Sequence, residues 1–184
     1  MKKFVLTILA IAVAASPALA QVGDISAYAD GAGTSCNIVD TAPGIITVNI
    51  LHKHTVGGTA SQWAVVLGGG ATLTFTGLQA APGMLMLGAP PTDVSISYGG
   101  CVVGDFLIAT VGYFGAGTSP ACSFISFAAA PTSPIPGEVA MVECDFETLS
   151  VVPTGQANIN PNASCQCDVA VNETTWGGIK ALYR

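Results

Sequence analysis

Charged side chains are scarce in this sequence, and basic side chains are the scarcest of all. Only 9% of the 184 residues are charged, and five Lys or Arg stand against eleven Asp or Glu. Neutralising a nucleic-acid backbone requires many Lys and Arg side chains, and attraction to an anionic membrane surface requires them too. The acidic composition therefore argues against nucleic acid or an anionic membrane as a partner.

Long apolar runs are also missing, except at the start of the chain. Lys2 and Lys3 precede an apolar run from Phe4 to Ala15, and Ala18-Leu19-Ala20 supplies a small-x-small cleavage site. Residues 1–20 match a bacterial-type secretory signal peptide, so we predict that the protein is secreted to the periplasm, cell surface or medium. No later apolar run approaches the roughly 20 residues of a transmembrane helix, and we expect no membrane span.

Histidine is nearly absent, with His52 and His54 as the only two. No Gly-x-Ser-x-Gly pattern occurs, and a serine-type hydrolase needs a nucleophile, a base and an orienting acid. We therefore predict that the protein is not an enzyme. In an extended strand the two imidazoles would lie on the same side and supply half of a metal site. A polar strand end is the alternative, and we favour it.

Three carboxylates gather at Glu143, Asp145 and Glu147. At strand spacing they would share one face, which suits a calcium site or a pair of catalytic carboxylates. A solvated strand edge that discourages aggregation is the alternative, and we favour it. We expect neither a bound metal nor a cofactor.

Short strand-forming segments punctuated by Gly, Pro, Ser and Thr fill residues 21–172. About nine such strands, with almost no helix signal, predict a single antiparallel β-sandwich. Residues 123–127 and 139–143 are expected to pair as a hairpin, residues 106–114 to form a central strand covered on both faces, and residues 78–91 to form a loop or short helix. The clearest further strands lie at residues 45–51, 63–67 (with Trp63 in the core), 72–76, 94–98 and 167–171.

Six cysteines in an exported chain indicate disulfide bonds; they are Cys36, Cys101, Cys122, Cys144, Cys165 and Cys167. The last two are neighbours on one face of a strand, so each should reach a different partner. Cys122 could pair with Cys144 across the expected hairpin, and a Cys101–Cys122 bond competes with that pairing.

The segment 173–184 differs from the rest of the chain. Ile179, Leu182 and Tyr183 follow the spacing of an amphipathic helical turn. Together with Trp176, they would either dock on an export or surface-attachment partner or pack on the sandwich. We predict a short C-terminal helical turn in this tail.

Three blocks of sequence resemble a group of uncharacterised secreted bacterial proteins. The blocks are Tyr28–Cys36, the Gly-Gly-Cys at Gly99–Cys101, and the closing Thr-Trp-Gly-x-Ile-Lys-x-Leu-Tyr-Arg at Thr175–Arg184. The resemblance implies export and a shared β fold. That group carries no assigned activity, so the resemblance implies no catalytic residues.

Low charge, expected disulfides and the lack of a catalytic set together favour one class of function. We predict a non-enzymatic structural or interaction protein of the cell exterior, which binds a protein or surface partner or associates with itself. The alternative is an extracellular ligand-binding module for carbohydrate or calcium, because sandwiches commonly carry such sites in their end loops.

Overall fold

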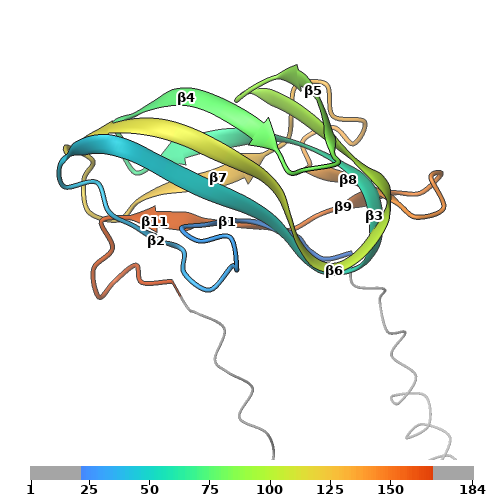
Figure 1. Ribbon diagram of the computed structural model, residues 1–184, viewed down its shortest axis with the longest axis horizontal. Coiled ribbons are helices and arrows are strands. Elements are labelled where there is room, and N and C mark those ends of the chain that lie inside the picture. Colours follow the sequence, from blue (N-terminus) through green and yellow to red (C-terminus); the bar gives the residue numbers. More distant parts are fainter. Residues whose placement is uncertain (1–21, 168–184) are drawn as a thin grey trace, which may run out of the picture.

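The computed structural model describes residues 22–167, which form an all-β body (Figure 1). No helix long and apolar enough to cross a membrane occurs in this range. The strands are β1 (Asp24–Tyr28), β2 (Asn37–Ile38), β3 (Pro43–Gly68), β4 (Leu73–Ala80), β5 (Leu85–Ala89), β6 (Asp93–Ala116), β7 (Ser123–Ala128), β8 (Ala140–Glu143), β9 (Leu149–Val151), β10 (Thr154–Gly155) and β11 (Ala157–Ile159).

Two long strands, β3 and β6, organise the whole body. They pair antiparallel from Pro43 opposite Ala116 to Trp63 opposite Val94, and they curve together round one end of the molecule (Figure 1). The sequence predicted two separate strands within each of them. That division is wrong, because the register shifts between His52 and Ala60 bend the paired strands without interrupting them.

The remaining strands attach to successive parts of β3 and β6 and close the predicted sandwich. One path of neighbours runs β10-β1-β3-β7-β11-β2, while β4 and β5 pair with β6, and β8 joins β3 to β9. Most pairs are antiparallel as predicted, although β1 with β10 and β11 with β2 are parallel. The predicted all-β sandwich is confirmed.

The core lies between the layers and follows the two-residue alternation of the strands. Trp63 is fully buried, as predicted, and its indole N–H donates to the Ser61 hydroxyl at 3.1 Å. The other large, fully buried apolar side chains of the core include Ile25, Ile50, Ile96, Ile108, Tyr113, Ile125, Met141 and Ile159.

Three local predictions are wrong. β7 and β8 do not form a hairpin, because β7 pairs with residues 64–68 of β3 while β8 pairs with residues 58–62. Residues 78–91 contain the end of β4 and all of β5 instead of a loop or helix. Residues 106–114 are covered fully on one face only, since Phe114 is 43% exposed. The signal peptide, residues 168–171 of the last predicted strand and the tail lie outside the described residues.

All six cysteines form disulfides, as predicted: Cys36–Cys167, Cys101–Cys144 and Cys122–Cys165. Cys165 and Cys167 reach different partners, also as predicted. Both of the pairings suggested for Cys122 are wrong. The reason is the bend in β3 and β6, which brings Cys101 to the end of β8, where Gly58 pairs with both Val102 and Glu143.

Candidate binding surfaces

The two histidines do not share a side of β3, so they do not form half of a metal site, which was the less favoured interpretation. The favoured interpretation, a polar strand end, is wrong as well, because β3 continues to Gly68 and buries His52. His52 is fully buried, with Nδ1 3.1 Å from the Tyr98 hydroxyl and Nε2 3.2 Å from the Val22 carbonyl oxygen. Burial lowers the pKa of His52. His54 has a φ of 59°, is exposed, and lies 2.8 Å from the Asp24 carboxylate. The irregular pairing between His52 and Thr55 separates them.

The predicted carboxylate cluster is also split, because β8 ends at Glu143. The Glu143 carboxylate accepts a hydrogen bond from the Ser150 hydroxyl. Asp145 accepts bonds from the Thr148 hydroxyl and from the backbone N–H groups of Thr148 and Glu147, and these bonds lower its pKa. No group of three or more His, Cys, Asp or Glu within residues 22–167 is placed to hold a metal ion.

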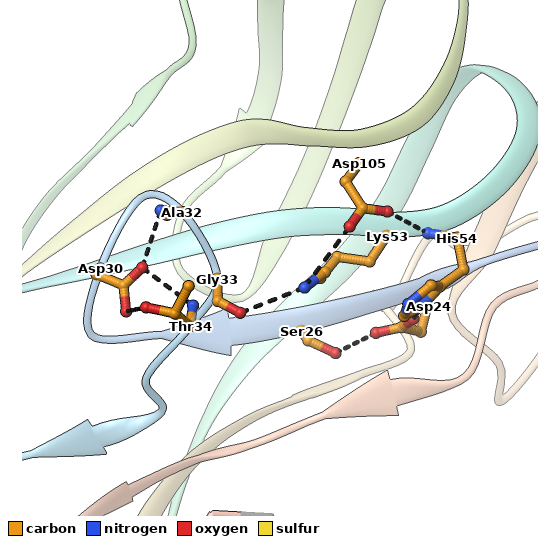
Figure 2. A network of polar contacts seen from close by, with 9 residues as sticks. All are labelled: Asp24, Ser26, Asp30, Ala32, Gly33, Thr34, Lys53, His54 and Asp105. Atoms are coloured by element: carbon orange, nitrogen blue, oxygen red, sulfur yellow. Dashed lines mark hydrogen bonds and ion pairs between the residues drawn. The ribbon is translucent and has the colours of Figure 1, made fainter. Parts of the chain in front are cut away.

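A polar network instead forms where a loop folds over β1 and β3 (Figure 2). The Asp30 carboxylate closes the loop by accepting hydrogen bonds from the N–H groups of Ala32 at 2.9 Å, Thr34 at 3.1 Å and Ser35 at 2.6 Å. Lost hydration opposes ionisation of Asp30, but the bonds from Thr34 and Ser35 outweigh it and lower the pKa. The loop is thereby held in one shape beside Lys53.

Lys53 is the only lysine or arginine among residues 22–167, and its side chain is 14% exposed. Its ammonium donates to the Gly33 carbonyl oxygen at 3.2 Å and lies 3.6 Å from the Asp105 carboxylate. It also lies 5.2 Å from the centre of the Tyr28 ring, a cation–π contact. Burial raises the pKa of Tyr28, and the Lys53 charge opposes that rise.

A hollow of about 480 Å³ opens beside this network. Its wall combines β1, the Gly33–Thr34 part of the loop, Lys53 and His54 of β3, and the segment that follows β10. Neutral polar side chains supply much of the wall, and no Asp or Glu belongs to it; the polar members are Ser26, Tyr28, Thr34, Gln156, Asn158 and Gln166. The Cys36–Cys167 disulfide completes the wall. We call this site the Lys53 hollow.

A second surface, which we call the uncharged face, spans β9, β8, β3, β6 and β5. Strand register places Leu149, Val142, Ala60, Ser97 and Leu85 in one row, and Val151, Ala140, Gln62, Ser95 and Leu87 in the next. Residues two apart in a strand point to the same side. The opposite side carries core residues such as Ile96 and Met141, so these two rows face outward.

Large apolar side chains stand at both edges of the uncharged face. Leu85 and Leu87 are each 60% exposed at one edge, and Leu149 and Val151 are 45% and 44% exposed at the other. Uncharged residues lie between them, with Ala140 buried, and a depression of about 220 Å³ forms there. The face is therefore an uncharged trough between two hydrophobic ridges.

Acidic residues border the uncharged face without entering its two rows. Asp93 begins β6, and Glu138 precedes β8. Asp145 and Glu147 lie in the turn between β8 and β9. The face therefore has an uncharged centre and an acidic rim.

Sequence reasoning predicted neither surface. A signal for the uncharged face was present, because residues 56–92 contain no charged side chain. A signal for the Lys53 hollow was weaker, namely that one lysine stands alone in a long acidic stretch of chain.

Comparison with solved structures places this architecture with the cohesin β-sandwiches. A cohesin module from a Clostridium perfringens family 33 glycoside hydrolase aligns with a TM-score of 0.51 and 8% identity, covering 77% of this chain and 99% of that one. A type II cohesin domain from the cellulosome of Acetivibrio cellulolyticus aligns with a TM-score of 0.50 and 14% identity, covering 79% and 98%. These likenesses show the fold alone. Neither the family models nor the curated proteins match this sequence.

Proposed function

We propose that this protein is a non-enzymatic interaction module of the cell exterior that binds a protein partner through the uncharged face. The observation that carries the proposal is the pair of exposed ridges, Leu85–Leu87 and Leu149–Val151, on either side of an uncharged trough. Contiguous exposed apolar surface rimmed by polar groups is typical of protein interaction sites.

The rim indicates the chemistry of the partner. Four carboxylates lie in the strand start and turns that border the face: Asp93, Glu138, Asp145 and Glu147. Glu143 lies on the Met141 side of β8, where its carboxylate accepts a hydrogen bond from the Ser150 hydroxyl. A complementary partner therefore presents apolar side chains at its centre and Lys or Arg around them. Complementary rims accelerate association, and salt weakens that effect.

The fold and the expected cellular location support this proposal. The two solved structures described above are cohesins, one from a glycoside hydrolase and one from a cellulosome. The three disulfides suit an oxidising exterior compartment, and the first twenty residues suggest export.

A matched pair of surface variants tests the proposal. The exported proteins of the source organism are passed over immobilised wild-type protein, and any captured partner is identified, purified and titrated. We expect the double variant L85D/L87D to lower the affinity by about tenfold or more, since charges would enter an apolar contact. The control I45D changes a side chain that is 71% exposed elsewhere on β3 and should bind as the wild type does.

Two results would contradict the proposed use of the uncharged face. Equal affinity of the wild type and L85D/L87D for the purified partner would refute this use of the face. If instead the protein binds only itself, sedimentation at increasing concentration will show an oligomer that L85D/L87D disperses, and the separate partner will be ruled out.

A further inference from the structure

The Lys53 hollow is a second candidate binding site, independent of the uncharged face. Every formally charged side chain among residues 22–167 other than Lys53 is a carboxylate, yet no carboxylate lines this hollow. A partly buried ammonium in such a wall favours an anion at close range. We propose that the hollow binds a sugar acid, meaning a saccharide of one or two rings that carries a carboxylate.

The Lys53 ammonium is oriented by its neighbours, and it retains hydrogen-bonding capacity for a ligand. An ammonium has three N–H donors, and one reaches the Gly33 carbonyl oxygen at 3.2 Å. The Asp105 carboxylate, at 3.6 Å, is farther than an ordinary hydrogen bond. The Tyr28 ring flanks the nitrogen at 5.2 Å. A ligand carboxylate can therefore accept a charge-assisted hydrogen bond from Lys53.

The rest of the wall suits sugar hydroxyls, which both donate and accept hydrogen bonds. Gln156 donates to the Asn158 side-chain oxygen at 2.8 Å, and Asn158 donates to the Cys165 carbonyl oxygen at 2.6 Å. These bonds fix the two amides in place. Ser26, Thr34 and Gln166 add further hydroxyl and amide groups to the wall that contains Lys53.

Size and charge together restrict the ligand. A volume of about 480 Å³ falls within the usual range for small-molecule sites. One ammonium matches one carboxylate, and Asp24, Asp30 and Asp105 contact the wall residues His54, Thr34 and Lys53 respectively. These carboxylates repel a ligand with several negative charges. A singly charged sugar therefore fits better than a polyphosphate or a polyanionic chain.

Isothermal titration calorimetry of the full chain with D-glucuronate, D-glucose and acetate tests the proposal. We expect D-glucuronate to bind about tenfold more tightly than D-glucose, because only the acid forms a charge-assisted hydrogen bond. Acetate, which lacks the hydroxyls, should bind more weakly than D-glucuronate. Equal affinity for all three ligands, or no binding of D-glucuronate at millimolar concentration, would overturn the proposal.

A charge-matched pair of variants locates the site. Lys53→Met removes the ammonium and keeps the length of the side chain, and we expect it to weaken D-glucuronate binding by about tenfold. Gln79→Glu makes the same change in net charge on β4, outside the hollow wall, and should bind as the wild type does. Unchanged binding by Lys53→Met would overturn the proposal.

If Lys53→Met does not fold, an NMR titration of the wild-type protein can still locate the D-glucuronate site. Amide NMR spectra recorded with D-glucuronate should shift the signals of Gly33, Thr34 and Gln156. Shifts confined to β5 and β9 would instead place the sugar on the uncharged face and refute the assignment to the hollow. Neither result affects the partner titration with L85D/L87D.

Discussion

At the scale of single residues, Asp40 ties three segments of the chain together. It is 1% exposed, and its carboxylate accepts hydrogen bonds from the N–H groups of Gly117 at 2.8 Å and Ser119 at 3.1 Å. The Asn160 side chain binds the Asp40 backbone from the other side. A bond from the Ser119 hydroxyl and the bonds from these amides outweigh burial and lower the pKa of Asp40.

Replacing Asp40 with Asn should therefore cost stability. We expect Asp40→Asn to lower the free energy of unfolding by about 2 kcal/mol, since a charged acceptor of several hydrogen bonds is lost from a buried site. Urea denaturation measures the change. Glu138→Gln removes the same charge from an exposed position and should alter stability by less than about 0.5 kcal/mol; equal effects would disprove the role of Asp40.

The Asp40 carboxylate should also make folding stability depend on pH in acid. Because the folded pKa lies below the ordinary value of 3.8, the ionised form is the one that folding favours. The stabilisation is present above the unfolded pKa and is lost as the pH falls through the lower folded value. Wild-type stability should therefore drop more steeply below pH 3.8 than that of Asp40→Asn, and parallel curves would contradict this.

The buried His52 should make folding stability depend on pH at milder acidity as well. Burial lowers its pKa from the ordinary 6.5, so folding favours the neutral imidazole. That stabilisation is present above pH 6.5 and is lost as the pH falls from there through the folded pKa. Calorimetry should show a lower melting temperature at mildly acidic pH than at neutral pH, and His52→Phe should reduce the difference. A difference of the same size in His52→Phe would assign the effect to other groups.

At the scale of elements, the bend of β3 and β6 separates the strand predictions that were correct from those that were wrong. Alternation is local, so residues 72–76 and 94–98 were correctly predicted as strands. Gly57-Gly58 and Gly99-Gly100 look like turns in the sequence, yet pairing of Gly58 with Val102 carries both strands through the bend. Strand continuity there depends on a partner strand far away in sequence, which local patterns do not contain.

Gly57 lies at this bend and leaves room for a disulfide. A Cβ there would lie 2.6 Å from the Cys144 sulfur and 3.4 Å from the Cys101 sulfur, and its φ is 154°. We expect Gly57→Ala to lower the free energy of unfolding by about 1–3 kcal/mol through overpacking. Gly44 has open space around it, so Gly44→Ala should leave stability nearly unchanged in the same thermal melt. Equal melting temperatures for the two variants would exclude crowding at Gly57.

The Lys53 hollow shows why a binding site can escape sequence reasoning. Its wall joins residues 26–28, 33–36, 53–54 and 155–167, which meet only because β1 lies between β3 and β10. For the histidine pair, the sequence suggested a site that the structure does not form. A regular strand would place His52 and His54 on one side, but the left-handed backbone at His54 turns its side chain to the surface.

At the scale of the whole molecule, the three disulfides connect distant parts of the sandwich. Cys36–Cys167 joins residues 131 apart, and each of the other two joins residues 43 apart. In the chain-entropy account, the long bridge contributes about 5 kcal/mol and each shorter bridge about 4 kcal/mol. The even number of cysteines predicted up to three bridges, but their pattern depended on the global path of the chain.

Removing the bridges one pair at a time tests this account. We expect Cys36→Ala/Cys167→Ala to lose about 1 kcal/mol more stability than Cys122→Ala/Cys165→Ala, measured by guanidinium unfolding of each double variant. The reverse order would show that contacts in the folded state, and not the restriction of the unfolded chain, decide the contribution.

The central claim concerns the uncharged face, and hydrogen–deuterium exchange of the complex with the purified partner tests it most directly. Amides of β5, β8 and β9 should exchange more slowly in the complex than in the free protein. Those of β4, which pairs with residues 109–115 of β6 and not with the residues 93–97 that pair with β5, should not change. Protection confined to β4 or to the Lys53 hollow, with β5 and β9 unaffected, would show that the partner binds elsewhere.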